Sequence, residues 1–403
     1  MKKLLALLCA AGMLLSVAAC GNNEEGTTNE DGTQETASSD IKVGFIFLHD
    51  ENSTYDKNFI DAATAATEAL GLTSEQVMFK TNIPESEECY NAAAELAEAG
   101  CDLVFADSFG HEDFIIQAAK EFSDVTFCHA TGTKAHTEGL PNYYNAFASI
   151  YEGRYLAGVA AGLKLNEMLA NGEITEPKMG YVGAFPYAEV KSGLTAFFLG
   201  ARSVCPEVTM DVKYTNSWFD IAAEKETANA LIAGGCVLIS QHADSEGAPK
   251  ACEEAGVPNV AYNLDTRSWG PNTALISSKI NWEPYFEHII KATMDGTPIT
   301  QDFCGGLKDD VVQILGLNEA VAAEGTQEKL DEVKAKLISG EIKVFDTSTF
   351  TVNGQQLTEY MADVDTDPEF TPDTQVISDG YFHESEMRSA PYFDLDIDGI
   401  TTK

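Results

Sequence analysis

Residues 41–71 read IKVGFIFL HDENSTYDKN FIDAATAATEALG, and this stretch decides how the rest of the chain is interpreted. Residues 41–48 are a short apolar run rich in branched and aromatic side chains, which is typical of a strand buried on both faces of a parallel sheet. Residues 49–58 are polar and turn-prone, and residues 59–70 carry apolar side chains at helical spacing. The stretch predicts a strand–loop–helix unit whose polar loop lies at the carboxyl end of the strand, where open α/β sheets bind small ligands.

The same alternation of strand and helix repeats along the chain in two sets. The first set extends from residue 41 to about residue 147, and the second begins with a strand predicted at residues 179–183. Two such sets predict an α/β fold with two doubly wound lobes. In both sets, aromatic and polar residues cluster after the strands, which is the main functional signal in the sequence. Residues 347–403 are acidic and look like a peripheral hairpin and tail.

The start of the chain predicts export and attachment to a membrane surface. Two lysines precede an apolar stretch that ends at Val17, and small residues then lead to Cys20. This ending resembles the lipobox of bacterial lipoproteins, in which the cysteine is lipidated; an ordinary signal peptide cut after Ala19 is the alternative. Residues 1–20 are therefore interpreted as a lipoprotein signal peptide and residues 21–40 as a flexible tether. We expect a body on the extracytoplasmic face of the cell membrane, held by a lipid anchor at Cys20.

Composition argues against several classes of function. The net charge of −39 repels nucleic acid phosphates, so we expect no nucleic acid partner. The nine cysteines form no CxxC pair and no Cys/His cluster of the zinc type, so we expect no metal site. Seven of them follow the tether and are interpreted as buried free thiols. The chain has no Gly-x-Ser-x-Gly or GxxxxGK[ST] motif, which favours a binding protein without a cofactor over an enzyme.

Rings and hydrogen-bonding groups that follow strands are the candidate ligand-binding residues. A flat ligand needs a ring at van der Waals distance and polar groups at its edge. The candidates are Asp50, Asn52, Tyr55, Phe59, Ser108, Phe109 and Thr131 in the first lobe, and Phe185, Asn216, Trp218, Gln241, Asp244 and Asp265 in the second. Each polar candidate has the alternative role of a helix cap, and each ring that of packing a turn or a hinge. His129 and His242, at strand ends, are interpreted as buried, hydrogen-bonded histidines.

Four segments resemble the basic membrane protein family, lipoproteins of the purine nucleoside receptor type that supply ABC transporters. They are FCHATG at 127–132, YEGRYLAG at 151–158, TNSWFD at 215–220 and GGLKD at 305–309. The resemblance covers residues 41–345. It implies a type I periplasmic-binding-protein fold, in which two lobes enclose a ligand cleft and are joined by three hinge crossings.

The resemblance also implies how the chain is divided between the lobes. The crossings are expected near Phe147, Leu264–Thr273 and Pro298–Gln301. The N-terminal lobe would then comprise residues 41–147 and 275–300, the C-terminal lobe residues 148–274 and 301–346, and the tail residues 347–403.

In family members that bind nucleosides, carboxylates and a lysine hold the ribose while aromatic rings enclose the base. Asp50 matches the aspartate of the first loop, and Phe59 matches the aromatic residue that follows it. Thr131 stands where an aspartate is expected, and the lysine position falls nearest Ile280. Asp265 lies near the aspartate of the second lobe. Because the ribose-holding pattern is incomplete, a free purine base or a related flat heterocycle fits as well as a nucleoside.

The resemblance implies a monomeric substrate-binding protein that captures a purine-like solute by lobe closure and delivers it to an ABC permease in the membrane. Two alternatives stay open. One is a surface sensor or adhesin with the same fold, and the other is a binder of a sugar or another small solute.

Overall fold

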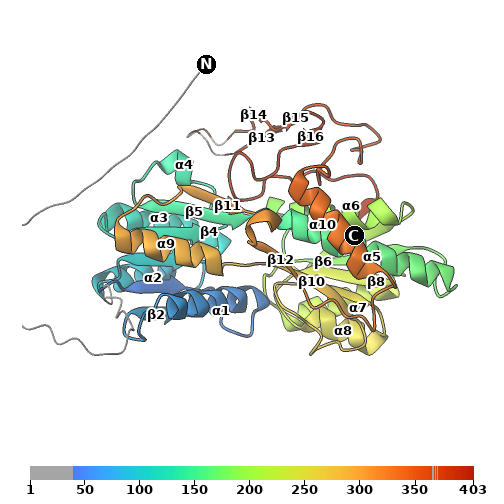
Figure 1. Ribbon diagram of the computed structural model, residues 1–403, viewed down its shortest axis with the longest axis horizontal. Helices are drawn as coiled ribbons and strands as arrows, with labels where there is room; N and C mark the ends of the chain where they lie inside the picture. Colours follow the sequence, from blue (N-terminus) through green and yellow to red (C-terminus); the bar gives the residue numbers. More distant parts are fainter. Residues whose placement is uncertain (1–39, 365–366, 368, 370) are drawn as a thin grey trace, which may run out of the picture. The chain divides into compact units, whose positions relative to one another are not determined.

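Two large β-sheets with helices packed on them organise the computed structural model of the protein, which describes residues 40–364, 367, 369 and 371–403 (Figure 1). The first sheet has the strand order β11-β5-β4-β3-β1-β2, and the second has the order β12-β10-β9-β8-β6-β7-β17. Neighbouring strands are parallel except for β12, which is antiparallel to β10. The predicted α/β fold with two doubly wound lobes is confirmed.

The first lobe is built around β1, the strand predicted at the start of the folded chain. Its strands are β1 (Val43–Ile46), β2 (Val77–Lys80), β3 (Leu103–Ala106), β4 (Thr126–Ala130), β5 (Tyr143–Ala148) and β11 (Asp302–Gly305), and its helices are α1 (Thr54–Ala69), α2 (Glu87–Glu98), η1 (Phe109–His111), α3 (Glu112–Glu121), α4 (Ala135–Glu138) and α9 (Glu283–Asp295). Every residue of β1 is buried, because helices cover both faces of the sheet. On one face Phe45 packs edge-on against Phe286 of α9, with ring centroids 5.3 Å apart. On the other, Gly44 leaves room for Leu96 of α2, which a β-carbon would approach to 2.8 Å.

The second lobe repeats this arrangement. Its strands are β6 (Lys178–Gly183), β7 (Thr209–Tyr214), β8 (Leu238–His242), β9 (Asn259–Tyr262), β10 (Ala274–Ile280), β12 (Val312–Leu315) and β17 (Ile400–Thr402), and its helices are α5 (Ile150–Ala170), α6 (Ala188–Val204), α7 (Ile221–Ala233), α8 (Gly247–Ala255), η2 (Leu307–Asp309) and α10 (Thr326–Ser339). Helices α5 and α6 pack backbone to backbone. A β-carbon at Gly158 would lie 2.0 Å from the carbonyl oxygen of Phe197, and one at Gly200 equally close to that of Tyr155. Glycine at these two positions therefore allows α5 and α6 to pack this closely.

The described chain passes between the two sheets three times, as expected, but two crossings lie at other residues. Strand β10 pairs with β9 and β12, so the assignment of residues 275–280 to the N-terminal lobe is wrong. Strand β11 pairs with β5, so residues 302–305 belong to the first lobe and not to the second. The crossings follow β5, β10 and β11. A short buried strand carries the same apolar pattern in either sheet, and the pattern does not name its neighbours.

The C-terminal tail is anchored to the second lobe. It contains two short antiparallel pairs, β13 (Met361–Ala362) with β14 (Thr374–Gln375) and β15 (Ile377–Ser378) with β16 (Tyr381–Phe382). Strand β17 then joins the second sheet beside β7. The ring of Phe393 stacks on Phe345, with centroids 4.3 Å apart. The tail therefore contains two short antiparallel strand pairs, and its end is a strand of the second sheet.

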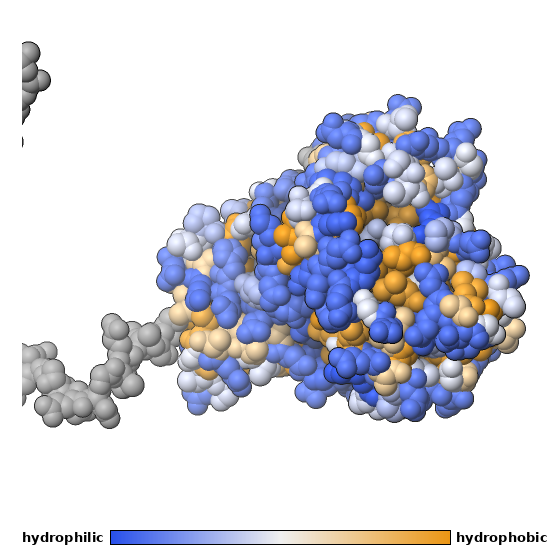
Figure 2. Space-filling model, turned by 45° about the vertical axis from the view of Figure 1, so that its right-hand side comes forward, coloured by the Kyte–Doolittle hydropathy of each residue, from blue (hydrophilic) through white to orange (hydrophobic). Residues whose placement is uncertain are grey.

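Within the described residues, the character of the surface and the state of the cysteines agree with what the sequence predicts. The face shown in Figure 2 is mostly hydrophilic with scattered hydrophobic residues, in keeping with the net charge of −39. The seven cysteines after residue 40 are free thiols; six are buried, and Cys304 is half-buried. No helix in the described part of the chain is both long and apolar enough to cross a bilayer. Cys20, the predicted lipidation site, lies outside the described residues.

Candidate ligand-binding site

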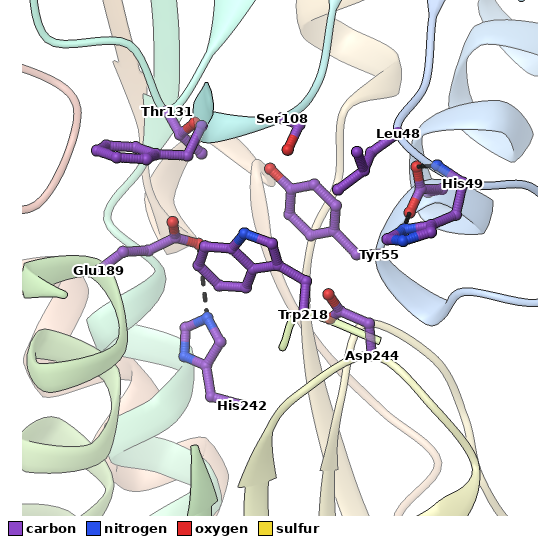
Figure 3. Close-up of a pocket in the computed structure, with 11 residues that line it drawn as sticks. Leu48, His49, Tyr55, Ser108, Thr131, Glu189, Trp218, His242 and Asp244 are labelled. Atoms are coloured by element: carbon purple, nitrogen blue, oxygen red, sulfur yellow. Dashed lines mark hydrogen bonds and ion pairs between the residues drawn. The ribbon is translucent and has the colours of Figure 1, made fainter. Parts of the chain in front are cut away.

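A narrow pocket lies between the two lobes (Figure 3). Its walls are formed by residues at the carboxyl ends of β1, β3, β4, β6, β7 and β8. They are Leu48, His49, Tyr55, Asp56, Ser108, Phe109, Thr131, Glu189, Trp218, His242 and Asp244. The position is the one that open α/β sheets use for ligands.

Asp56 holds the loop between β1 and α1 in place. Its Oδ1 accepts a hydrogen bond from the backbone N–H of His49 at 2.7 Å, and its Oδ2 accepts one from the hydroxyl of Ser53 at 2.5 Å. Ser53 in turn caps α1 by accepting a hydrogen bond from the N–H of Asp56. Burial opposes ionisation of Asp56, but the hydrogen bonds from His49 and Ser53 hold its pKa below the ordinary value. The loop therefore presents His49 and Tyr55 to the pocket from a fixed base.

Tyr55 is fixed at both ends of its side chain. Its ring packs against Phe59 one helical turn away, with centroids 4.8 Å apart, and its hydroxyl donates a hydrogen bond to the carbonyl oxygen of Asp107 at 2.9 Å. Oδ1 of Asp107 accepts a hydrogen bond from the N–H of Leu48, while its Oδ2 has no partner among the described residues. Burial, and next the charge of Asp56, raises the pKa of Asp107 well above its ordinary value.

Thr131 lines the pocket in a strained backbone conformation. Its φ is +65°, in the left-handed region that branched residues rarely adopt. The N–H of Thr131 donates to the carbonyl oxygen of Ala146, and its hydroxyl donates to that of Ala130. Strain of this kind concentrates at ligand sites.

Trp218 supplies the indole of the second lobe. It lies in the loop after β7, and Phe185 packs edge-on against it with centroids 5.1 Å apart. The carbonyl oxygen of Trp218 accepts a hydrogen bond from the N–H of Asp244 at 2.9 Å. Figure 3 shows the rings of Tyr55 and Trp218, from opposite lobes, bordering the same space.

Two acidic residues of the second lobe face this space beside the indole (Figure 3). Glu189, in the first turn of α6, has its Oε1 3.5 Å from Nε2 of His242. Burial lowers the pKa of His242, and Glu189 opposes that shift. Asp244 has no side-chain hydrogen-bond partner among the residues that the structure describes. Burial, and next the charge of Glu224, raises the pKa of Asp244 well above its ordinary value.

The lobes touch each other around the pocket. The N–H of Thr54 in α1 donates a hydrogen bond to the carbonyl oxygen of Asp244 at 2.8 Å. At the mouth, Phe109 and Tyr187 have ring centroids 5.5 Å apart and are about two-fifths exposed, at 42% and 43%. The two lobes are therefore closed on each other, and residues of both surround the same space.

Six of the predicted residues line the pocket together: Tyr55, Ser108, Phe109, Thr131, Trp218 and Asp244. Their role in ligand binding stays a prediction. The other seven, Asp50, Asn52, Phe59, Phe185, Asn216, Gln241 and Asp265, lie outside the lining.

The predicted carboxylates outside the pocket are occupied by local partners. Oδ1 of Asp50 accepts hydrogen bonds from the backbone N–H and the side-chain amide of Asn52, at 3.0 and 2.8 Å, so both residues serve the turn. Asp265 forms an ion pair with Arg267, with Oδ2 and the guanidinium 2.5 Å apart. Both carboxylates therefore serve local turns and not the pocket.

The other predicted residues support the site from behind or lie elsewhere. Phe59 is fully buried and stacks on Trp282 with centroids 4.5 Å apart, so it belongs to the core. Phe185 packs behind the indole. Gln241 is fully buried, and its amide donates to the carbonyl oxygen of Ser245. Asn216 is exposed in the left-handed region, at φ +58°.

Four residues of the lining were not predicted to bind a ligand: Leu48, His49, Glu189 and His242. A fifth, Asp56, was recognised only as one of several polar groups of the first loop. Asp56 was expected in a loop at 49–58 but lies in the first turn of α1, which begins at Thr54 and not near residue 59. Glu189 lies in the first turn of α6. His242 is buried as predicted, yet it also faces the pocket. No group of three or more metal-ligating side chains gathers within the described part of the chain.

Comparison with known proteins gives consistent matches over most of the chain. The model of the Bmp family, described as PnrA-like ABC transporter substrate-binding protein, matches residues 44–348. A purine-binding protein of Brucella abortus is 34% identical over 77% of this chain and 84% of its own length. A putative ABC transporter glucose-binding protein of Haloferax volcanii is 30% identical over 76% of this chain and 72% of its own. A solved structure, the solute-binding protein of an ABC transporter system from Conexibacter woesei, has a TM-score of 0.62 at 20% identity, over 75% of this chain and 98% of that one.

Proposed function

The chain belongs to the Bmp family of PnrA-like ABC transporter substrate-binding proteins, as the sequence predicted, and we propose that it captures a purine in the pocket between its lobes. Proteins of this family are extracytoplasmic, membrane-associated components of transporters, and they bind small molecules for delivery to a permease. The proposal concerns the identity of the ligand and the way in which the body is held at the membrane.

The gathering of Tyr55, Phe109 and Trp218 in one narrow pocket is the observation that carries the purine proposal. Rings from both lobes offer π-faces to a flat ligand, and stacking of a base on an aromatic side chain contributes about 1–3 kcal/mol per base. A purine adds donors and acceptors along its edge that side chains can recognise. The similarity to a purine-binding protein of Brucella abortus supports the same class.

Within this class, we favour a free base over a nucleoside. Asp50 and Asp265, the residues matched to ribose-holding positions, are bonded to Asn52 and Arg267 and lie outside the pocket. Thr131 replaces a third expected carboxylate.

We further propose that Cys20 is lipidated and that residues 21–40 tether the monomeric body to the extracytoplasmic face of the membrane. The lipobox-like end of the signal sequence supports this. Metabolic labelling with a fatty-acid analogue should mark the wild-type protein and leave Cys20→Ser unlabelled. Label on both proteins, or on neither, would contradict the assignment.

A sugar is the second candidate ligand. The similarity to the putative glucose-binding protein of Haloferax volcanii favours it, as do the three carboxylates of the lining, Asp56, Glu189 and Asp244. Carboxylates accept hydrogen bonds from hydroxyl groups as readily as from ring nitrogens.

Calorimetric titration separates the two candidates. Protein unfolded, dialysed and refolded to remove any bound solute is titrated with adenine, guanine, hypoxanthine, adenosine, inosine and glucose. We expect heat from at least one base and none from glucose. Binding of glucose alone would replace the purine proposal, and no heat from any of the five purine compounds would refute it. Mass spectrometry of solutes released during unfolding gives an independent identification.

A further inference from the structure

The charged side chains that line the pocket are acidic or histidine. Its lining contains three carboxylates, Asp56, Glu189 and Asp244, and two histidines, but no lysine or arginine. The carboxylate of Asp56 is engaged by His49 and Ser53 within its own loop. The carboxyl groups that remain for a ligand are those of Glu189 and Asp244, both in the second lobe.

Both residues are held where they have few protein partners. Glu189 is 9% exposed and Asp244 is 4% exposed. Oε1 of Glu189 lies 3.5 Å from Nε2 of His242. Within the described residues, Oε2 of Glu189 and both carboxyl oxygens of Asp244 have no hydrogen-bond partner. Figure 3 shows the two carboxyl groups on either side of the indole of Trp218. These oxygens face the pocket and can accept hydrogen bonds from a ligand, and each bond formed adds affinity.

The chemistry of these groups restricts the ligand edge that they can read. An ionised carboxylate only accepts hydrogen bonds. Adenine offers its 6-amino group and guanine its 2-amino group beside a ring N–H. Hypoxanthine and xanthine have no amino group. Bound in the same pose, they would place a carbonyl oxygen where the amino group of adenine or guanine lies, and that oxygen would face another acceptor. Burial raises the pKa of Asp244, but even a protonated carboxyl still accepts a hydrogen bond through its carbonyl oxygen. His242 lies 3.5 Å from Oε1 of Glu189, which leaves Oε2 to accept from a ligand.

Resting on the proposed purine function, we propose that Glu189, together with Asp244, accepts hydrogen bonds from an amino group of the ligand. The site then prefers aminopurines such as adenine and guanine to oxopurines such as hypoxanthine and xanthine. It also rejects anionic derivatives, because a phosphate would enter a pocket lined by carboxylates without a lysine or arginine to pair with.

Calorimetry on the full chain at neutral pH tests this preference with adenine, guanine, hypoxanthine, xanthine and AMP. We expect adenine or guanine to bind at least about tenfold more tightly than either oxopurine, because the loss of a hydrogen bond to a carboxylate weakens binding by about this factor. AMP should give no heat. Glu189→Gln presents an amide donor in place of a carboxylate oxygen. It should reduce the preference to about threefold or less, mainly by weakening the binding of the aminopurine. Glu207→Gln, an exposed glutamate just beyond the other end of α6, is the matched control and should retain the wild-type preference.

The outcomes separate this inference from the function on which it rests. Absence of binding by every purine refutes the proposed function. Binding of hypoxanthine as tightly as adenine by the wild-type protein refutes the inference alone, as does an unchanged preference in Glu189→Gln. If Glu189→Gln unfolds, the wild-type preference together with Asp244→Asn, which should also narrow it, decides the question.

Discussion

Replacement of Trp218 is the most direct test of the idea that rings from two lobes hold a flat ligand. The indole lines the pocket, and its position is maintained by Phe185, 5.1 Å away between centroids, and by the hydrogen bond between its carbonyl oxygen and the N–H of Asp244. Trp218→Ala removes one stacking surface. Because base stacking on an aromatic side chain is worth about 1–3 kcal/mol, Kd should rise by about 5- to 150-fold. Trp218→Phe keeps a ring and should lose much less.

Tryptophan fluorescence provides the assay. The chain has three tryptophans, and they occupy different environments. Trp218 lines the pocket, Trp282 is buried in the core of the first lobe, and Trp269 is half-buried outside the pocket lining. Binding of a base should therefore change the emission of Trp218 above all. Trp269→Phe is the control and should keep both the affinity and the spectral change.

Two results would refute the reasoning about Trp218. One is an affinity of Trp218→Ala within about twofold of wild type, since loss of a stacking face should exceed this. The other is an unchanged fluorescence response in Trp218→Phe. Unfolding of each variant in urea shows whether the body is intact, so that a lost affinity is not mistaken for a lost fold.

Three further substitutions test the packing and electrostatics around the site. Phe393→Ala removes a fully buried ring that stacks on Phe345, and its free energy of unfolding in urea should fall by about 3–5 kcal/mol; a loss below about 1 kcal/mol would contradict the anchoring of the tail. Tyr55→Phe removes the hydrogen bond to the carbonyl oxygen of Asp107 but keeps the ring, so stability should fall by about 1 kcal/mol while the stacking contribution to ligand affinity is retained. Burial raises the pKa of Glu224 from 4.5 to about 7, so the stability that it contributes is fully present below pH 4.5 and is lost as the pH rises through about 7. Glu224→Gln should therefore reduce the drop in unfolding free energy between about pH 5 and pH 8 by up to about 3 kcal/mol, and an unchanged drop would show that Glu224 is not the group responsible.

The fold could be predicted from local patterns because each strand–loop–helix unit carries its own signals. The apolar run at 43–46, the cap at Ser53 and the helical spacing after it all agree in β1 and α1. What local patterns do not encode is the neighbour of a strand. Residues 274–280 have the apolar character of a buried strand in either lobe, and only pairing with β9 and β12 assigns them to the second. For this reason, two of the three crossings were predicted at the wrong residues.

The site shows the same limit at the level of single side chains. Tyr55 and Phe59 are four residues apart on one face of α1, so both were candidates for the ligand face. The first turn of the helix reaches the pocket, so Tyr55 lines it. The next turn lies beneath the pocket, where Phe59 packs between Tyr55 and Trp282. Glu189 was missed for the complementary reason. It belongs to the first turn of a helix, where an acidic residue ordinarily interacts with the helix dipole, and only its proximity to His242 and the pocket reveals another role.

The contacts that close the lobes involve the same residues that line the pocket, and this links ligand capture to closure. Asp244 faces the pocket with its carboxyl group and accepts a hydrogen bond from Thr54 of the other lobe with its carbonyl oxygen. Phe109 lines the pocket and meets Tyr187 at the mouth. A ligand can favour closure only through contacts that it makes better in the closed state, and a solute between Tyr55 and Trp218 makes them with both lobes at once. Opening the lobes for release to a permease must break the Thr54–Asp244 and Phe109–Tyr187 contacts and the ligand contacts together. If the lining residues recognise the ligand as proposed, the same residues also set how firmly the lobes stay closed around it.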